Sequence, residues 1–226
     1  MEHVFLDFEM NPIPKKNKEA REIVRSEIIE IGAVKLDEQY QQVGRYSCYV
    51  RPEYGEIARN ITLLTGITQA DVQDAPPLSQ ALEDFLGWIG PGKVRVYSWS
   101  DSDRSQLLRE CTLKGLYPDR LPAPFRRWMD FQRVYTRLMG LSRRSNLSLR
   151  NAMGAVDQDF SGDQHRAVDD AENSASLLTL VKDPQAFQER VRLVQSFFGE
   201  QPDQGTTLGD LFGDAFAGIQ WADSEK

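Results

Sequence analysis

The chain has 226 residues, of which 40% are hydrophobic and 27% are charged. That length predicts one domain with a sizeable core. The two cysteines form no CxxC pair, which argues against a disulfide framework or a zinc ribbon and favours a reducing, cytoplasmic setting. No apolar run reaches the roughly 18 residues of a membrane span, and the first residues show no signal-peptide pattern.

The formal net charge is −7 at pH 7. Because phosphate affinity comes mainly from lysine and arginine, an acidic chain is at first sight a poor nucleic-acid binder. The objection is weak for an enzyme that holds one strand end, since divalent cations bound by acidic residues would cancel their charge locally. The net charge therefore neither supports nor excludes a function in nucleic-acid binding.

Apolar residues recur first at the period of strands and later at the period of helices. Strands are expected at residues 4–9, 27–36, 45–50 and 94–99, and the second and third could form a hairpin. Helices are expected from residue 61 to about 66 and at 78–89, 103–113, 131–139, 147–153, 166–180 and 184–198. The polar segment 11–26 and the proline-rich segment 116–127 are expected to be loops.

This order of elements predicts an α/β layered domain with a mixed sheet. We expect the domain to span residues 1–198 and residues 199–226 to form a C-terminal tail. The tail is apolar enough to pack on the domain or to bind a partner protein, and a loosely attached tail is an equally good interpretation.

Two acids lie in the first predicted strand. Residues two apart in a strand point to the same face, so Asp7 and Glu9 would share a face with Phe5. Burial would remove solvation from each carboxylate, and the two would repel each other. A divalent cation between them would remove both costs. The alternative is an edge strand whose polar face is wet.

A second acidic segment, HRAVDDA, begins at His165. Helical spacing places Asp170 on the same face as Ala167 and other small residues, whereas Asp169 joins Asn173 on a polar face suited to water. On a continuous helix His165 would lie about 140° from Asp170. The two could therefore share a site only if His165 lies in the loop before the helix. A polar capping cluster with an incidental histidine is the alternative.

Asp103 stands at the start of a predicted helix, in the segment SWSDSDRSQLL. Aspartate and serine are favoured as helix N-caps, so capping is a strong alternative to any chemical role. By itself this segment predicts no chemistry.

Taken together, three motifs resemble those of the DEDDh exonucleases, the superfamily of polymerase proofreading subunits, oligoribonuclease and ribonuclease T. They are Asp7–Phe8–Glu9, Asp103-x-x-x-Leu107 and His165-x-Ala167-x-x-Asp170. Segments 26–34 and 61–68 also resemble elements of the family, and the match runs in order from residue 3 to about 182. The DFEM start and the Trp99 segment look most similar to the Eri-1-like branch, which includes bacterial proteins described as sporulation inhibitors.

The resemblance implies a ribonuclease H-like three-layer fold and a metal-dependent 3′→5′ exonuclease. Asp7 would bridge two divalent ions, Glu9 and Asp170 would complete the first metal site, and Asp103 would support the second. Oxygen ligands suit Mg²⁺ or Mn²⁺. His165 would be the general base toward the attacking water, because histidines exchange protons near neutral pH. These five residues would be catalytic.

The substrate implied is a single-stranded nucleic acid with a free 3′ end, cut to 5′-mononucleotides, with RNA favoured over DNA. The sequence departs from the family after Glu9, where Met10 and Asn11 replace the Thr-Thr of many members, and before Asp103, where the usual Asn and Phe are missing. Met10 and Asn11 are predicted to line the terminal base and sugar, and Phe8 to be core. Basic residues that follow could bind phosphates or form a solvated loop: Lys15, Lys16, Lys18 and Arg21.

Two other classes of function fit the same residues. A regulatory protein could keep the exonuclease fold and bind a partner through the tail, as kinship with sporulation inhibitors would imply. A different metal phosphoesterase could use the same acids on a small nucleotide.

Overall fold

The computed structural model describes residues 1–139, 141 and 147–199. Its strands are β1 (Glu2–Pro12), β2 (Ser26–Leu36), β3 (Gln42–Tyr49), β4 (Val94–Ser98) and β5 (Trp128–Asp130). Its helices are α1 (Lys18–Ile23), α2 (Arg59–Thr65), α3 (Gln69–Val72), α4 (Leu78–Ile89), α5 (Ser102–Leu113), α6 (Phe131–Leu138), α7 (Leu149–Gly154), α8 (Ala167–Lys182) and α9 (Pro184–Gly199), with a 3-10 turn η1 (Pro124–Arg127).

The strands form one mixed sheet in the order β3-β2-β1-β4-β5. β1 pairs antiparallel with β2, and β2 pairs antiparallel with β3. β4 is parallel to both β1 and β5. The predicted α/β domain with a central mixed sheet is therefore confirmed, as is the hairpin of the second and third strands.

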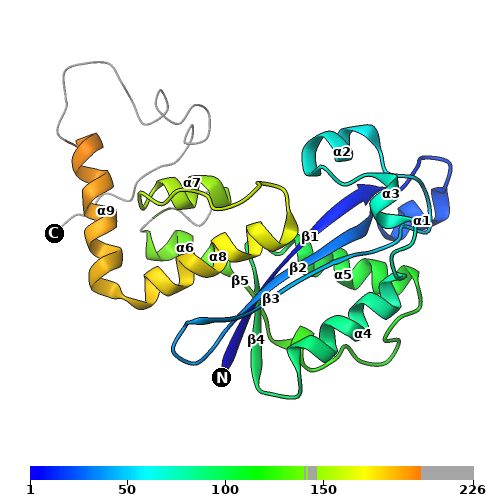
Figure 1. Cartoon of the computed structure of the whole chain (residues 1–226), viewed down its shortest axis with the longest axis horizontal. Coiled ribbons are helices and arrows are strands. Elements are labelled where there is room, and N and C mark those ends of the chain that lie inside the picture. The colour runs from blue at the N-terminus through cyan, green and yellow to red at the C-terminus, as the bar shows by residue number, and fades with distance from the viewer. Residues whose placement is uncertain (140, 142–146, 200–226) are drawn as a thin grey trace.

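Helices cover both faces of the sheet, which makes three layers (Figure 1). One core lies between the sheet and α6, α7 and α8, and it contains Phe5 of β1. The other lies between the sheet and α4 and α5, and it contains Val4, Leu6 and Phe8. The alternation along β1 is thus the predicted one, and Phe8 is core as expected. Asp7 and Glu9 follow Phe5 at two-residue steps, toward the α8 layer.

Gly32 of β2 lets α8 approach the sheet very closely. A Cβ atom at position 32 would lie 2.0 Å from the backbone nitrogen of Val168, in the first turn of α8. No real side chain tolerates that separation. The absence of a side chain at Gly32 therefore fixes how near the start of α8 lies to β2.

The expectation of a loop over residues 11–26 is wrong in part. β1 continues to Pro12, and residues 18–23 form α1. A small apolar cluster of Ile13, Ala20 and Val24, packed against Tyr54, holds this segment on the domain. The side chain of Asn17 also donates a hydrogen bond to the Tyr54 carbonyl at 2.7 Å. The lysine-rich composition hid these three apolar anchors.

Two short elements were not predicted. β5 has three residues and pairs with β4, and α3 has four residues; neither is long enough to show a period. By contrast, the prediction for α4 matches at both ends.

Among the described residues, every helix is too short or too polar to cross a membrane. Residues 200–226, nearly all of the predicted tail, lie outside the described part of the chain. The boundary at 198 and the role of the tail therefore stay predictions.

Candidate active site

β1 brings two acids to the site because it runs on beyond its parallel neighbour. Its pairing with β4 ends at Phe5, while its pairing with β2 continues. Asp7 is partly buried and Glu9 is 8% exposed. A register shift between Glu9 and Met10 marks a bulge just after the second acid. Such irregularities bend a strand and redirect its side chains, and they are common beside active sites.

Asp103 reaches the same end of β1 from α5. With β4 no longer alongside, the backbone N–H of Phe8 donates a hydrogen bond to Asp103 Oδ1 at 3.2 Å. The Ser102 hydroxyl donates to the other carboxylate oxygen at 3.3 Å. Asp103 is 4% exposed and lies inside the helix, because the N-cap position belongs to Asp101. The capping interpretation of Asp103 is therefore wrong.

His165 lies in a turn just before α8, as its spacing from Asp170 requires. Its backbone has a φ of +66°, in the left-handed region that few residues other than glycine adopt. The backbone N–H of His165 donates a hydrogen bond to Asp170 Oδ2 at 3.2 Å. The turn thus folds back over the first turn of α8 and brings residues five apart into contact.

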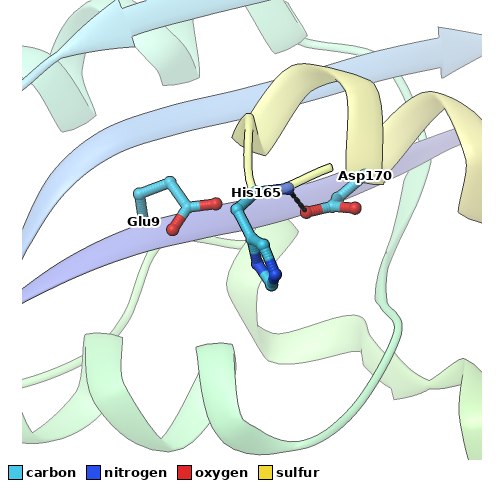
Figure 2. Close-up of side chains that lie close together, drawn as sticks. All are labelled: Glu9, His165 and Asp170. Carbon is cyan, nitrogen blue, oxygen red and sulfur yellow. Dashed lines mark hydrogen bonds between the residues drawn. The ribbon is translucent and has the colours of Figure 1, made fainter. Parts of the chain in front are cut away.

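Three of the predicted residues converge. Figure 2 shows Glu9 and Asp170 on either side of His165, whose imidazole extends below both carboxylates in this view. Each of the three offers a potential ligand atom, and these atoms all lie within 4.8 Å of one another. They come from β1, the turn and α8, so only the tertiary fold unites them.

Burial, more than mutual repulsion, disfavours ionisation of the four acids. Burial, followed by the charges of Asp170 and Glu30, raises the pKa of Glu9 to about 9. Burial is also the largest cause for the other three: the pKa rises to about 7 for Asp170 and about 6 for Asp103, and well above the usual range for Asp7. For Asp7, the charges of Asp103, Asp170 and Glu9 add to the effect.

Among the described residues, no lysine or arginine forms an ion pair with Asp7, Glu9, Asp103 or Asp170. The charge of Arg166, which pairs with Glu30, lowers the pKa of Glu9 only in part. Four clustered carboxylates without a paired cation need protons or bound cations. Carboxylate oxygens suit hard divalent ions such as Mg²⁺ and Mn²⁺. The donor set therefore fits a divalent-metal centre.

The two predicted substrate-binding residues lie just beyond these acids. Met10 is partly buried against the α4 and α5 core. Asn11 is fully buried, and its amide is engaged: Nδ2 donates to the Glu56 carbonyl at 3.1 Å, and Oδ1 accepts the Ala58 N–H at 2.8 Å. Asn11 thus anchors the segment that leads into α2. Contact of either residue with substrate stays a prediction.

Sequence reasoning missed the residues that hold the His165 turn. Helical spacing predicts that Asn173 lies on a solvent-exposed face, but its exposed fraction is 2%. Its Oδ1 accepts the Ser161 N–H at 2.9 Å, and its Nδ2 donates to the Ser161 and Asp169 carbonyls at 2.8 and 2.7 Å. Asp169 accepts the Asp163 N–H at 2.9 Å. A polar helical face can signal a bound loop as well as solvent, and the periodicity does not distinguish them.

A ribonuclease H-like sheet with a carboxylate cluster at the end of β1 is the architecture of a class of nucleases. A family model for the RNase_T exonucleases matches residues 4–178. The chain belongs to this exonuclease family, as its motifs predicted.

Relatives and solved structures agree with that placement. Human ERI1 exoribonuclease 2 is 30% identical over 175 residues, which cover 67% of this chain and 24% of that protein. The 3′-5′ exonuclease Snipper of Drosophila melanogaster is 29% identical, covering 72% of this chain and 63% of Snipper. The nuclease domain of 3′hExo, a DEDDh member bound to rAMP, is similar in fold, with a TM-score of 0.67, 23% identity, and coverage of 80% of this chain and 92% of that domain.

Proposed function

We propose that this chain is a metal-dependent 3′→5′ exonuclease that hydrolyses single-stranded RNA to 5′-mononucleotides. The observation that carries the proposal is the convergence of Glu9, His165 and Asp170, whose potential ligand atoms lie within 4.8 Å of one another. Asp7 and Asp103 add two further carboxylates whose charges act on the same cluster. This combination supports hydrolysis of a phosphodiester better than it supports a purely structural role.

The four carboxylates would hold two divalent ions, Mg²⁺ or Mn²⁺. Asp7 would serve both, Glu9 and Asp170 would complete one site, and Asp103 would support the other. When bound, such ions stabilise the attacking and leaving oxygens of an in-line displacement. The protein's own task is to keep these mutually repelling acids together, which it does through the sheet and the Phe8 N–H that holds Asp103.

His165 would be the general base. A ring nitrogen of its imidazole lies within 4.8 Å of carboxylate oxygens of Glu9 and Asp170, and the ring would accept a proton from the attacking water. The left-handed turn keeps this side chain outside α8, whose regular geometry would carry it about 140° away from Asp170.

The preference for RNA is proposed from the relatives. Several are named exoribonucleases, and one similar structure concerns recognition of a histone mRNA stem-loop by a 3′-exonuclease. Met10, and Asn11 through the segment that it anchors, are proposed to form part of the site for the terminal nucleotide. Other structures of similar fold are exonuclease I bound to DNA oligonucleotides, so the choice of sugar is part of the test.

Three further predictions from the sequence stay proposals: a cytoplasmic location, an exonuclease domain over 1–198, and a protein partner for residues 199–226. The relatives are named as nucleases or as a DNA polymerase, which does not favour a regulatory binding module as the main function.

The test is a time course on 5′-labelled single-stranded RNA and its DNA counterpart, with Mg²⁺, Mn²⁺ or EDTA. We expect a metal-dependent ladder that shortens from the 3′ end, faster on RNA, and lost in Asp170→Ala and Asp103→Ala. The matched control is Asp119→Ala, because Asp119 is exposed and lies beyond the end of α5 at Leu113. That variant should keep wild-type activity.

Absence of cleavage by folded, metal-loaded protein would overturn the exonuclease proposal. Cleavage of mononucleotide esters without cleavage of oligomers would instead identify a different phosphoesterase.

A further inference from the structure

A fifth carboxylate, Glu30, lies at the site but belongs to none of the predicted motifs. Glu30 stands directly opposite Glu9 on the neighbouring antiparallel strand, and it is fully buried. Like charges at directly opposed positions destabilise a sheet. A buried glutamate in this position therefore requires a specific set of partners.

Both oxygens of Glu30 are engaged by hydrogen-bond donors. Oε1 accepts from Arg166 Nη2 at 3.0 Å and from the Ser47 hydroxyl at 3.1 Å. Oε2 accepts from the backbone N–H of Ala167 at 3.3 Å. In contrast to Glu9 and Asp170, this carboxylate has an arginine beside it. Its bonding fits an anchor better than a metal ligand.

The donors from Arg166 and Ala167 directly follow His165 in the chain. His165 itself has the left-handed φ of +66°, a conformation that costs about 1–3 kcal/mol unless its surroundings impose it. Its N–H is held by Asp170 on one side, and the next two residues are held by Glu30 on the other. The turn is therefore clamped between α8 and β2.

We propose that Glu30 is the positioning residue for His165: by holding Arg166 and the Ala167 N–H, it keeps the turn closed and the imidazole beside Glu9 and Asp170. This inference rests on the proposed function. Glu30 contacts no reacting atom, so it acts through His165 rather than as a catalytic residue. Gly32, two residues further along β2, permits the close approach that these hydrogen bonds require.

Glu27 provides a matched control on the same strand. It is also fully buried, and it accepts backbone N–H groups, from Glu53 at 2.8 Å and Tyr54 at 2.9 Å. Its cation is Lys114, at 3.3 Å. Glu27→Gln and Glu30→Gln therefore make the same chemical change at equally buried positions, but only the second lies at the His165 turn.

The first measurement is steady-state kinetics of both variants, alone and combined with His165→Ala. Removal of a group that orients a functional side chain commonly costs about 10–100-fold. We expect Glu30→Gln to lower kcat by that factor with KM unchanged. In the His165→Ala background its effect should shrink to less than about 3-fold, because residues that act through one another are non-additive. Glu27→Gln should leave kcat unchanged in both backgrounds.

The second measurement, amide hydrogen exchange over residues 161–170, needs no activity. Glu30→Gln should speed exchange in this segment, and Glu27→Gln should not. Should Glu30→Gln fail to fold, Arg166→Gln removes one donor of the same clamp at a partly exposed position. An equal loss of kcat with and without His165, or unchanged exchange, would each overturn the inference. If the wild type were inactive but Glu30→Gln still accelerated exchange, the exonuclease function would be overturned, while the role of Glu30 in holding the His165 turn would stand.

Discussion

Two clusters of buried carboxylates lie in this domain, and they are built in opposite ways. The lysine cluster consists of Glu27, Glu110 and Lys114. Lys114 Nζ lies 2.9 Å from Glu110 and 3.3 Å from Glu27. The backbone N–H of Ile28 also donates to Glu110 at 2.8 Å. Burial raises the pKa of Glu110, and the charge of Lys114 opposes that rise.

The active-site cluster consists of Asp7, Glu9, Asp103 and Asp170, and it has no such cation among the described residues. Its acids receive only isolated hydrogen bonds, such as those to Asp103 and Asp170. The lysine cluster joins α5 to β2 and is complete within the protein. The active-site cluster lacks a paired cation, and this lack indicates that it binds a positively charged ligand.

The largest effect is expected from Asp7→Asn. Loss of one preorganised electrostatic group commonly lowers turnover by about 10²–10³-fold, and a shared metal ligand should lie at or above that range. The folded protein should be no less stable than wild type in EDTA, because the change removes repulsion. Exonuclease rates and thermal melting of the same preparation check both parts. If Asp7→Asn lost activity because it unfolded, the active-site acids would be stabilising the fold, as the lysine cluster does, and the contrast between the two clusters would be wrong.

The next largest effect is expected from Lys114→Met. Removing one partner of a buried charge group costs about 3–5 kcal/mol, because Glu27 and Glu110 would remain without their cation. Urea denaturation should show that loss, while kcat at temperatures where the variant is folded stays within about 2-fold of wild type. The exposed Lys93→Met is the control. A large fall in kcat of folded Lys114→Met would mean that the lysine cluster also shapes the site.

A smaller effect concerns pH and Glu9. Its pKa is about 9 in the fold and 4.5 as the ordinary value, so between these pH values the folded protein binds a proton that the unfolded chain lacks. The free energy of unfolding of metal-free protein should therefore fall as pH rises through this window, by up to about 1.4 kcal/mol per pH unit for each such group.

Denaturation in EDTA from pH 5 to 9 measures this slope. Glu9→Gln should flatten it, and saturating Mg²⁺ should flatten it in wild type. Glu19→Gln, at an exposed position, is the control. If the free energy of unfolding fell equally with pH in Glu9→Gln and in wild type, the raised pKa of Glu9 would be contradicted.

The smallest effect on the free energy of unfolding is expected from ion pairs at the protein surface. Arg45 is half exposed and pairs with Asp169 and Glu172. The side chain of Asp169 is only 15% exposed, whereas that of Glu172 is 36% exposed. Exposed ion pairs contribute about 0–1 kcal/mol, so the coupling between Arg45 and Glu172 should be no larger than that. A double-mutant cycle of Arg45→Ala with Glu172→Ala measures the coupling, and a value of several kcal/mol would show that exposure does not control the strength of these pairs.

Much of the fold could be predicted from the sequence because long elements repeat their pattern. The buried run of β2 and the stripe of α4 are examples. β5 and α3 are too short for a period to appear. α1 was hidden because charged residues of both signs dominate its sequence, KEAREI, while only a few apolar residues hold it in place.

The site was predicted by motif and geometry together. The spacing of His165 and Asp170 required a turn before α8, and the structure has one. The role of Asp103 was invisible locally, because its partner is a backbone N–H 95 residues away. Glu30 and Asn173 could not be assigned for the same reason: their function depends on which distant loop they contact, and no local pattern encodes that contact.

Gly32 has a consequence for protein engineering. Any side chain at position 32 would collide with the backbone of Val168. This position therefore accepts only glycine unless α8 moves. A saturation library at this position should therefore behave like a library at a functional residue, although glycine carries no functional group. Gly32 pairs with Asp7 across β1 and β2, so a redesign that shifts α8 relative to the sheet has a natural starting point at this residue.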